Sequence, residues 1–245
     1  MPSIMSTDPI VRNATDPIVR NAVSIGVATA VYAVSFGVLS VAAGFSVAQT
    51  CVMSLACFTG ASQLTFVSVI GAGGGVAGAL PPALLLAGRN ALYALSLKDV
   101  LSGTARKRAL RAQVVVDETT AMAHAQSTPA AKRRAFDLTA LCLFTAWNIG
   151  TLAGALAGRG LGSPRDYGLD AVFPAVFLAL LAPRLRGPEA MRAAVAGALI
   201  ALALVPIAPA GLPIIASALG AVPGLLAAGR RRSRVAVAQA PEAGR

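Results

Sequence analysis

Polar side chains gather at the centre of one of the most apolar stretches of this chain. Residues 51–70 contain no charged residue, yet the middle of the run reads Thr59-Gly60-Ala61-Ser62-Gln63. Glycine weakens a helix by about 1 kcal/mol relative to alanine, and the hydroxyl and amide groups need hydrogen-bond partners. The pattern predicts a discontinuous helix near 59–63, where freed backbone groups and the polar side chains bind a small solute. The alternative is close helix packing through the small residues, with Gln63 as an interhelical hydrogen-bond partner.

A second candidate group lies in the apolar run 76–97. Here Tyr93 follows Arg89 by four positions and Asn90 by three, so the three side chains share one helix face. An arginine at the centre of a membrane helix costs about 2.5–3.5 kcal/mol, and it usually faces a cavity or a counter-charge. A guanidinium can bind a carboxylate through two parallel hydrogen bonds. The group therefore predicts a site for the anionic part of a substrate, and a structural ion pair is the alternative.

Three acidic residues are candidates for coupling or gating. Asp170 opens a short apolar run, where it could pair with Arg89, stabilise a helix start or carry a coupling proton. Asp117 and Glu118 lie in a basic stretch and form either a gate or a solvated face. The three cysteines lie in apolar runs without metal-ligand spacing, so neither a zinc site nor a disulfide framework is indicated. No metal or cofactor is expected.

The composition places these residues in a membrane protein. Of 245 residues, 56% are hydrophobic and 13% are charged, and the mean hydropathy is +0.70. Soluble domains carry about 25% charged residues, and several uncharged runs here reach the length of about 20 residues that spans a bilayer. The net charge is +11, and the lysines and arginines that produce it cluster between the apolar runs. This distribution is typical of membrane topology determinants, and it does not indicate nucleic-acid binding.

The sequence predicts an all-α integral membrane protein with about seven transmembrane helices. Pro81-Pro82 removes two backbone donors from the third run and predicts a second discontinuity near 81–90. The predicted crossings are 22–43, 47–70, 76–97, 138–157, 168–181, 193–208 and 212–228.

A single transmembrane domain is expected over 21–229. It follows a polar tail, 1–20, that contains the octapeptide TDPIVRNA in tandem, and it precedes a basic tail, 230–245. The positive-inside rule places the basic tail and a polar segment at about 98–137 in the cytoplasm. The side of the N-terminus is left open, because one early segment could be re-entrant.

These residues also form part of a longer ordered pattern. It includes Ser35-Phe36-Gly37, the run FTGASQ at 58–63, the arginine-bearing helix, Asp117-Glu118 and the run YGLD at 167–170. From about residue 32 to 181 the pattern resembles the AzlC family, the large subunit of two-component branched-chain amino acid exporters. The chain departs from the family at Asn90, where the family shows histidine, at Ala87, where it shows asparagine, and at Val116, where it shows threonine.

The resemblance implies export of valine, leucine, isoleucine or analogues across the bacterial inner membrane. It also implies a small AzlD-type membrane subunit as partner. No nucleotide-binding motif is present, since the glycines at 71–75 lack the lysine of a phosphate loop, so ion-gradient coupling is expected.

The predicted function is a secondary transporter with its site at the Gly60 break. Backbone N–H groups and Arg89 suit a carboxylate, and freed carbonyls with Gln63 or Ser62 suit an ammonium. The alternative is a passive channel or scaffold subunit. An enzyme is not expected, because the single histidine, His124, lies far from Ser62 in the sequence and in a polar segment.

Overall fold

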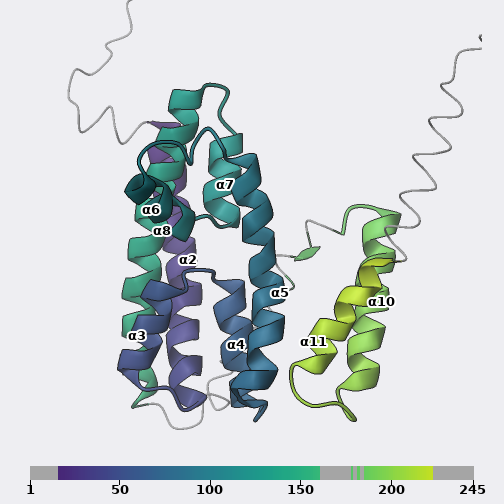
Figure 1. Ribbon diagram of the computed structural model, residues 1–245. Coiled ribbons are helices and arrows are strands. Elements are labelled where there is room, and N and C mark those ends of the chain that lie inside the picture. The colour runs from purple at the N-terminus through teal and green to yellow at the C-terminus, as the bar shows by residue number, and fades with distance from the viewer. Residues whose placement is uncertain (1–15, 161–177, 179–180, 183–184, 223–245) are drawn as a thin grey trace, which may run out of the picture.

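The computed structural model describes residues 16–160, 178, 181–182 and 185–222, and every element assigned there is helical (Figure 1). This confirms the all-α prediction for that part of the chain. In chain order the elements are α2 (Pro17–Ala42), α3 (Val47–Ala56), α4 (Ala61–Gly71), α5 (Gly75–Ser96), α6 (Ala105–Gln113), α7 (Asp117–His124), α8 (Pro129–Gly158), α10 (Pro188–Leu204), α11 (Leu212–Ser217) and the 3₁₀ turn η3 (Ala218–Gly220).

Two of the described helices, α2 and α8, are long and apolar enough to cross a membrane by length and composition. The α8 helix begins well before the predicted start at 138, because the Thr128 hydroxyl accepts the Ala131 N–H at 3.3 Å and Pro129 occupies the first turn. The predicted crossing 47–70 is wrong, because α4 runs back beside α3 (Figure 1), and a Cβ atom built on Gly71 at the end of α4 would lie 3.4 Å from the Cβ of Ala43 just before α3. Residues 47–70 therefore begin and end at the same end of the bundle, as in the alternative of a re-entrant early segment. The number of crossings among the other runs stays a prediction. The predicted crossing 168–181 lies almost entirely outside the described residues, and 212–228 lies partly outside them.

The α2 and α8 helices pack along their length, and small residues set their separation. Gly150, Gly154 and Gly158 recur at every fourth position of α8. A Cβ atom built on Gly150 would lie 2.7 Å from the carbonyl oxygen of Ala30, and one built on Gly158 would lie 3.1 Å from the Cα of Val38. The first distance is too short for a side chain, and the second would require Val38 to move by a few tenths of an ångström. The glycine stripe therefore brings the two backbones together, as small residues do in membrane helix pairs.

The core beside this stripe is aromatic. Phe36 on α2 stacks on Trp147 of α8 with ring centroids 5.7 Å apart, and both side chains are buried. Ala33, Leu64 and Leu143 belong to the same cluster, so α4 packs against the α2–α8 pair. This cluster fixes the inner surface on which the candidate site is built.

The predicted discontinuity near 81–90 is wrong. The α5 helix runs unbroken from Gly75 to Ser96 through Pro81 and Pro82. The fixed φ of proline fits a helix, and each proline removes only one backbone hydrogen bond and crowds the preceding turn. That turn contains Gly78, where a Cβ atom would lie 2.9 Å from the Ala210 carbonyl oxygen. The lost bonds are thus confined to one turn that packs closely on the segment before α11.

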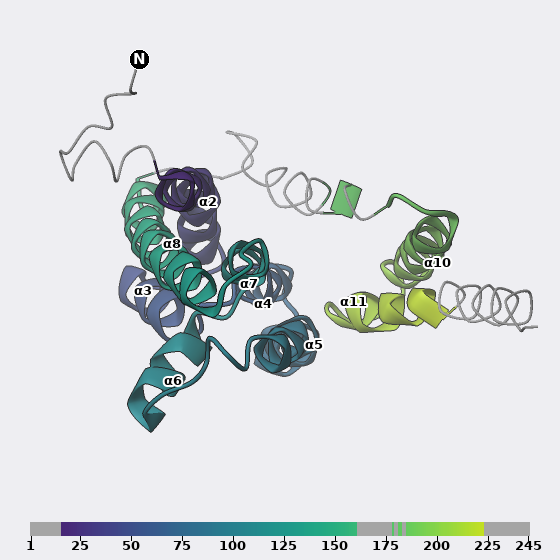
Figure 2. The same cartoon turned by 90° about the horizontal axis from the view of Figure 1, so that it is seen from above.

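The short helices α4 and α7 stack end to end. Figure 1 places α7 above α4, and in Figure 2, seen from above, the two overlap. Thr119, Met122 and Ala123 of α7 are buried, and α7 contacts α8 and α5. The segment 117–124, although it lies in the polar stretch predicted to be cytoplasmic, therefore completes the helical column that α4 begins.

Asp16 ties the start of α2 to α8. Its Oδ1 accepts the Ile18 N–H at 2.8 Å, and its Oδ2 lies 2.5 Å from Nη1 of Arg134. The hydrogen bond from Arg134 and then that from Ile18 hold the pKa of Asp16 below its usual 3.8. A depressed carboxyl pKa stabilises the fold above the unfolded value, and the contribution is lost as the pH falls below 3.8 through the folded-state pKa.

We expect Asp16→Asn to lower Tm by about 1–2 °C at pH 7, because asparagine keeps the helix cap and loses only the charge. As the pH falls through the folded-state pKa the wild type becomes protonated as well, so the difference should be smaller at about pH 2. Thermal unfolding in detergent at both pH values measures this. Asp99→Asn is the control, since that exposed carboxylate forms no ion pair within the described ranges. A loss of the same size at both pH values would contradict a charge effect.

Candidate functional site

A cavity of about 60 Å³ lies where α3 and α4 separate. It reaches the molecular surface and has room for roughly four to six water-sized groups. Its lining comes from α2, the α3–α4 break, α5, the start of α7, and α8. Segments distant in the sequence thus meet at one point halfway along the helical bundle.

The break itself covers residues 57–60, between the end of α3 and the start of α4. The prediction of a discontinuity here is confirmed, although Ser62 and Gln63 already belong to α4. Gly60 has φ 59° and ψ −93°, a conformation that only glycine adopts without strain. The Thr59 hydroxyl donates to the Cys57 carbonyl at 3.0 Å and satisfies one of the backbone groups that the break exposes.

Gln63 holds the two half-helices together. Its Oε1 accepts the Gly60 N–H at 3.2 Å, and its Nε2 donates to the Met53 carbonyl of α3 at 2.9 Å. The side chain is 2% exposed and does not line the cavity. Both ends of the amide therefore bind backbone groups at the break. This agrees with the alternative prediction, in which Gln63 is an interhelical hydrogen-bond partner.

A second glutamine, Gln113, was not predicted from the sequence. Its Nε2 donates to the Ala56 carbonyl at 2.7 Å and to the Leu55 carbonyl at 3.3 Å. These are the last carbonyls of α3, which no helical N–H can reach. Gln113 ends α6 and precedes α7, so the α6–α7 connection is attached directly to the break. A single glutamine in a polar stretch carries no sequence signal for this role.

An ion pair forms one wall of the cavity. Arg89 Nη1 lies 2.8 Å from Asp117 Oδ2, and the Tyr93 hydroxyl donates to Asp117 Oδ1 at 2.5 Å. Arg89 and Tyr93 thus use the shared α5 face that their spacing predicted. The Arg89 and Asp117 side chains are 25% and 23% exposed, so the pair is accessible from the cavity. The Nε of Arg89 is buried without a hydrogen-bond partner, which leaves one donor unused.

Two helix N-termini also converge at the cavity. Ala61 begins α4 and Asp117 begins α7, and both residues line the space. The N-terminus of a helix carries a partial charge of about +0.5, which attracts anions. Asp117 and Glu118 balance this charge at α7, whereas the first turn of α4 contains no acidic residue. The α4 end and Arg89 therefore give the cavity a region that favours a carboxylate, beside two acidic side chains.

Another part of the lining is apolar and aromatic. Phe58 meets Trp147 edge to face, with ring centroids 6.3 Å apart, and Leu64, Val116 and Leu143 complete the surface. Trp147 is 4% exposed, and its Nε1 has no hydrogen-bond partner among the described residues. The sequence alone does not place this tryptophan at the cavity, because α8 lies far from the break in the chain. Its spacing of four from Leu143 was the available signal for a shared face.

The structure separates the predicted site residues into two groups. Those that line the cavity are Thr59, Gly60, Arg89, Asp117 and Glu118. Those placed next to it but outside its lining are Ser62, Gln63, Asn90 and Tyr93. Ser62 Oγ and Asn90 Oδ1 are buried without hydrogen-bond partners. Asp170 lies outside the described residues.

We expect Gln63→Ala to lower Tm by about 2–10 °C, because it removes both contacts between the half-helices and leaves the partly buried Gly60 N–H without its partner, at about 1–3 kcal/mol. The Met53 carbonyl keeps the Cys57 N–H at 2.9 Å. The matched control is Gln49→Ala. Gln49 makes the equivalent contact to the Ser46 N–H at 2.8 Å, but it is exposed. Thermal unfolding of both variants in detergent measures the difference. Equal and small shifts, with transport lost only in Gln63→Ala, would assign Gln63 to the substrate instead.

Comparison with known proteins adds to this geometry. The family model described as AzlC protein matches residues 24–161, which is more than half of the chain and contains the cavity-lining residues. An uncharacterized membrane protein of Archaeoglobus fulgidus is 34% identical over 190 residues, which cover 76% of this chain and 83% of that protein. No solved structure matches the chain.

Proposed function

Because the chain belongs to the AzlC family of membrane transport proteins, we propose that it exports branched-chain amino acids through the cavity at the α3–α4 break. The substrates are valine, leucine, isoleucine or their analogues, and an ion gradient drives the export. The protein works as a multi-pass permease of the bacterial inner membrane. Its partner is a small AzlD-type membrane subunit.

One observation carries this proposal: the lining of the cavity combines charged side chains with large apolar ones. Arg89, Asp117 and Glu118 line the cavity together with Phe58, Leu143 and Trp147. An α-amino acid with an aliphatic side chain combines the same two kinds of surface. Its carboxylate and ammonium suit the charged residues, and its side chain suits the apolar ones. A purely ionic or purely apolar solute would leave one of the two sets without partners.

The ion pair between Arg89 and Asp117 suggests how an amino acid substrate binds in the cavity. Opening a partly buried ion pair is unfavourable, because each charge loses its partner. An amino acid supplies both charges at once, so its carboxylate replaces Asp117 at Arg89 while its ammonium replaces Arg89 at Asp117. The 2.8 Å contact between the two side chains is then the closed state of a gate. Asp117 and Glu118 act as the gating acids, and Asp170 remains the proposed carrier of a coupling proton.

The apolar wall sets the breadth of the substrate range. Each buried methylene contributes about 0.8 kcal/mol, so a larger aliphatic side chain binds more tightly if it fits. One methylene gives only about 10–200-fold discrimination. Valine, leucine and isoleucine should therefore compete with one another.

Counterflow in proteoliposomes tests the proposal. Vesicles that contain the purified protein and its partner are loaded with unlabelled valine and diluted into labelled valine. A carrier accumulates label transiently by exchange. A passive channel lets label equilibrate without overshoot, and a scaffold gives the rate of empty vesicles. Absence of overshoot with valine, leucine and isoleucine would reject the proposed function.

Dipeptide feeding tests substrate class and partner dependence in cells. Cells that take up and hydrolyse a valine- or leucine-containing dipeptide accumulate the free amino acid unless they export it. Expression of this chain with the small subunit should lower the intracellular pool, and expression of either one alone should not. A pool that is unchanged by the pair would count against export.

A further inference from the structure

The α6 helix presents three consecutive cations that have no acidic partner. Arg106, Lys107 and Arg108 are all exposed, and none forms an ion pair with an acid in the described ranges of the chain. No residue of α6 is buried. Leu110 lies beside them with 63% of its surface exposed. The helix therefore owes its position to contacts at its end and not to a hydrophobic core.

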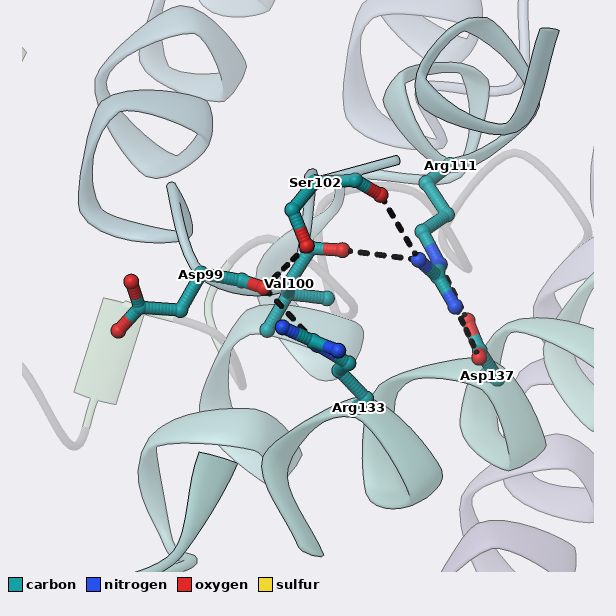
Figure 3. Close-up of polar contacts among 6 residues, drawn as sticks. All are labelled: Asp99, Val100, Ser102, Arg111, Arg133 and Asp137. Atoms are coloured by element: carbon teal, nitrogen blue, oxygen red, sulfur yellow. Dashed lines mark hydrogen bonds and ion pairs between the residues drawn. The ribbon is translucent and has the colours of Figure 1, made fainter. Parts of the chain in front are cut away.

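Two polar anchors hold α6 in place. Arg111 forms a two-pronged contact with Asp137 of α8, with Nε 2.9 Å from Oδ1 and Nη2 2.6 Å from Oδ2 (Figure 3). Its Nη1 donates to the Val100 and Ser102 carbonyls at 3.0 and 3.3 Å. The hydrogen bonds that Arg111 donates to Asp137 raise the pKa of Arg111, so the anchor stays charged at every physiological pH. Gln113 adds the contact to α3 described above. The three cations are thus displayed on a fixed segment.

This charge pattern opposes the stability of α6 in isolation. Cations are unfavourable near the positive N-terminal end of a helix, and the first turn of α6 contains no acidic residue. Three adjacent like charges also repel one another. An external anion removes both penalties. Local features that destabilise the fold without compensation within the chain are typical of binding surfaces.

The location of α6 identifies the anion. Its anchor Asp137 lies on α8, one residue before the apolar run 138–157 that is predicted to cross the membrane. The cations therefore lie at the level where the apolar part of a membrane helix meets lipid headgroups. Exposed Leu110 is suited to the acyl-chain region next to them. Lys98, which follows α5, and Arg133 on α8 are exposed in the same basic region.

We propose that α6 is a binding site for the headgroups of anionic phospholipids, with Arg106, Lys107 and Arg108 as the recognition residues. Each cation near a lipid surface contributes roughly fivefold to binding of an anionic lipid, which corresponds to about 1 kcal/mol. The site is independent of the transported substrate. Because the α6–α7 connection contacts the break through Gln113 and leads to Asp117, a bound lipid also stabilises the segment that carries the gate.

The test uses the purified full-length protein in detergent, titrated with phosphatidylglycerol or with phosphatidylcholine of the same acyl chains. Native mass spectrometry gives the apparent affinity for each lipid. The wild type should prefer phosphatidylglycerol, and Arg106→Gln/Lys107→Gln/Arg108→Gln should lower that preference by about a hundredfold. The preference should also fall as the salt concentration rises.

Two matched variants show whether lipid binding depends on the α6 cations or on the total positive charge of the protein. Arg106→Lys/Arg108→Lys keeps the charge and should keep the preference. Arg230→Gln/Arg231→Gln/Arg232→Gln removes the same charge from the C-terminal basic cluster and should leave the preference intact. An equal loss in this control, or no loss in the α6 variant, would overturn the proposal. Complete displacement of phosphatidylglycerol by inorganic phosphate would do the same, because it would indicate a free-anion site.

Discussion

Replacing Arg89 with alanine is expected to reduce valine counterflow by about a hundredfold or more, while the protein still folds and inserts. In the proposed mechanism the change removes the guanidinium that pairs with the substrate carboxylate. A hydrogen bond to a charged group contributes about 1.5–3 kcal/mol, and a loss of about 2.7 kcal/mol corresponds to a hundredfold. Asp117 keeps the Tyr93 hydroxyl at 2.5 Å, so this carboxylate is not left without a partner.

The same variant can distinguish transport from structure. If the pair with Asp117 only stabilises the fold, Arg89→Ala/Asp117→Asn should recover transport, because the unpaired charge is gone. If Arg89 binds the substrate, the double variant should fold as well as the wild type and remain inactive. Arg89→Lys should retain part of the activity, since the charge is kept and the two-pronged geometry is lost. Near wild-type counterflow in the double variant would contradict a direct role.

The second large effect is expected on thermal stability, from a substitution in the glycine stripe of α8. Gly154→Ala should lower Tm by about 5–10 °C, because its Cβ would overlap the backbone of Val34 on α2. The α2 and α8 backbones would have to separate, and the stack of Phe36 on Trp147 would loosen. The sole tryptophan of the chain is buried in this interface, so its fluorescence reports the loss directly.

Gly88→Ala provides the matched control for this experiment. Gly88 lies in α5, and a Cβ atom built there has no neighbour within 4 Å. Alanine at a helical position is favoured over glycine by about 0.5–1 kcal/mol, so Tm should stay level or rise slightly. If Gly154→Ala shifted Tm no more than Gly88→Ala, close contact of the two backbones would not be needed for the fold.

The sequence was informative where a local pattern has one physical solution. Gly60 in an uncharged run predicted the break, and the spacing of Arg89 and Tyr93 predicted that both would act on one side of a helix. Ser62 and Gln63 also pointed to the break, but their role was read incompletely. A glutamine three positions after the N-cap residue is a capping signal, and Gln63 acts in this way on Gly60.

Other features could not be read from local pattern. The partner of Arg89 is Asp117, which only the return of α7 brings to the cavity. The sequence suggested a pairing with Arg89 only for Asp170, as one of three possible roles of that residue. Trp147 and Leu143 reach the cavity because the glycine stripe draws α8 against α2. Pro81 and Pro82 predicted a break by their lost hydrogen bonds, yet the helix tolerates them. Each case depends on packing between segments that are distant in the chain.

The break between α3 and α4 also affects which solutes the proposed transport pathway excludes. The C-terminal end of α3 carries negative partial charge and the N-terminal end of α4 carries positive partial charge, and the break places both at the same depth. The electrostatic potential therefore changes sign between the two helix ends. In the proposed transport pathway this favours a zwitterion over an inorganic ion of either sign, which would limit current leak during export.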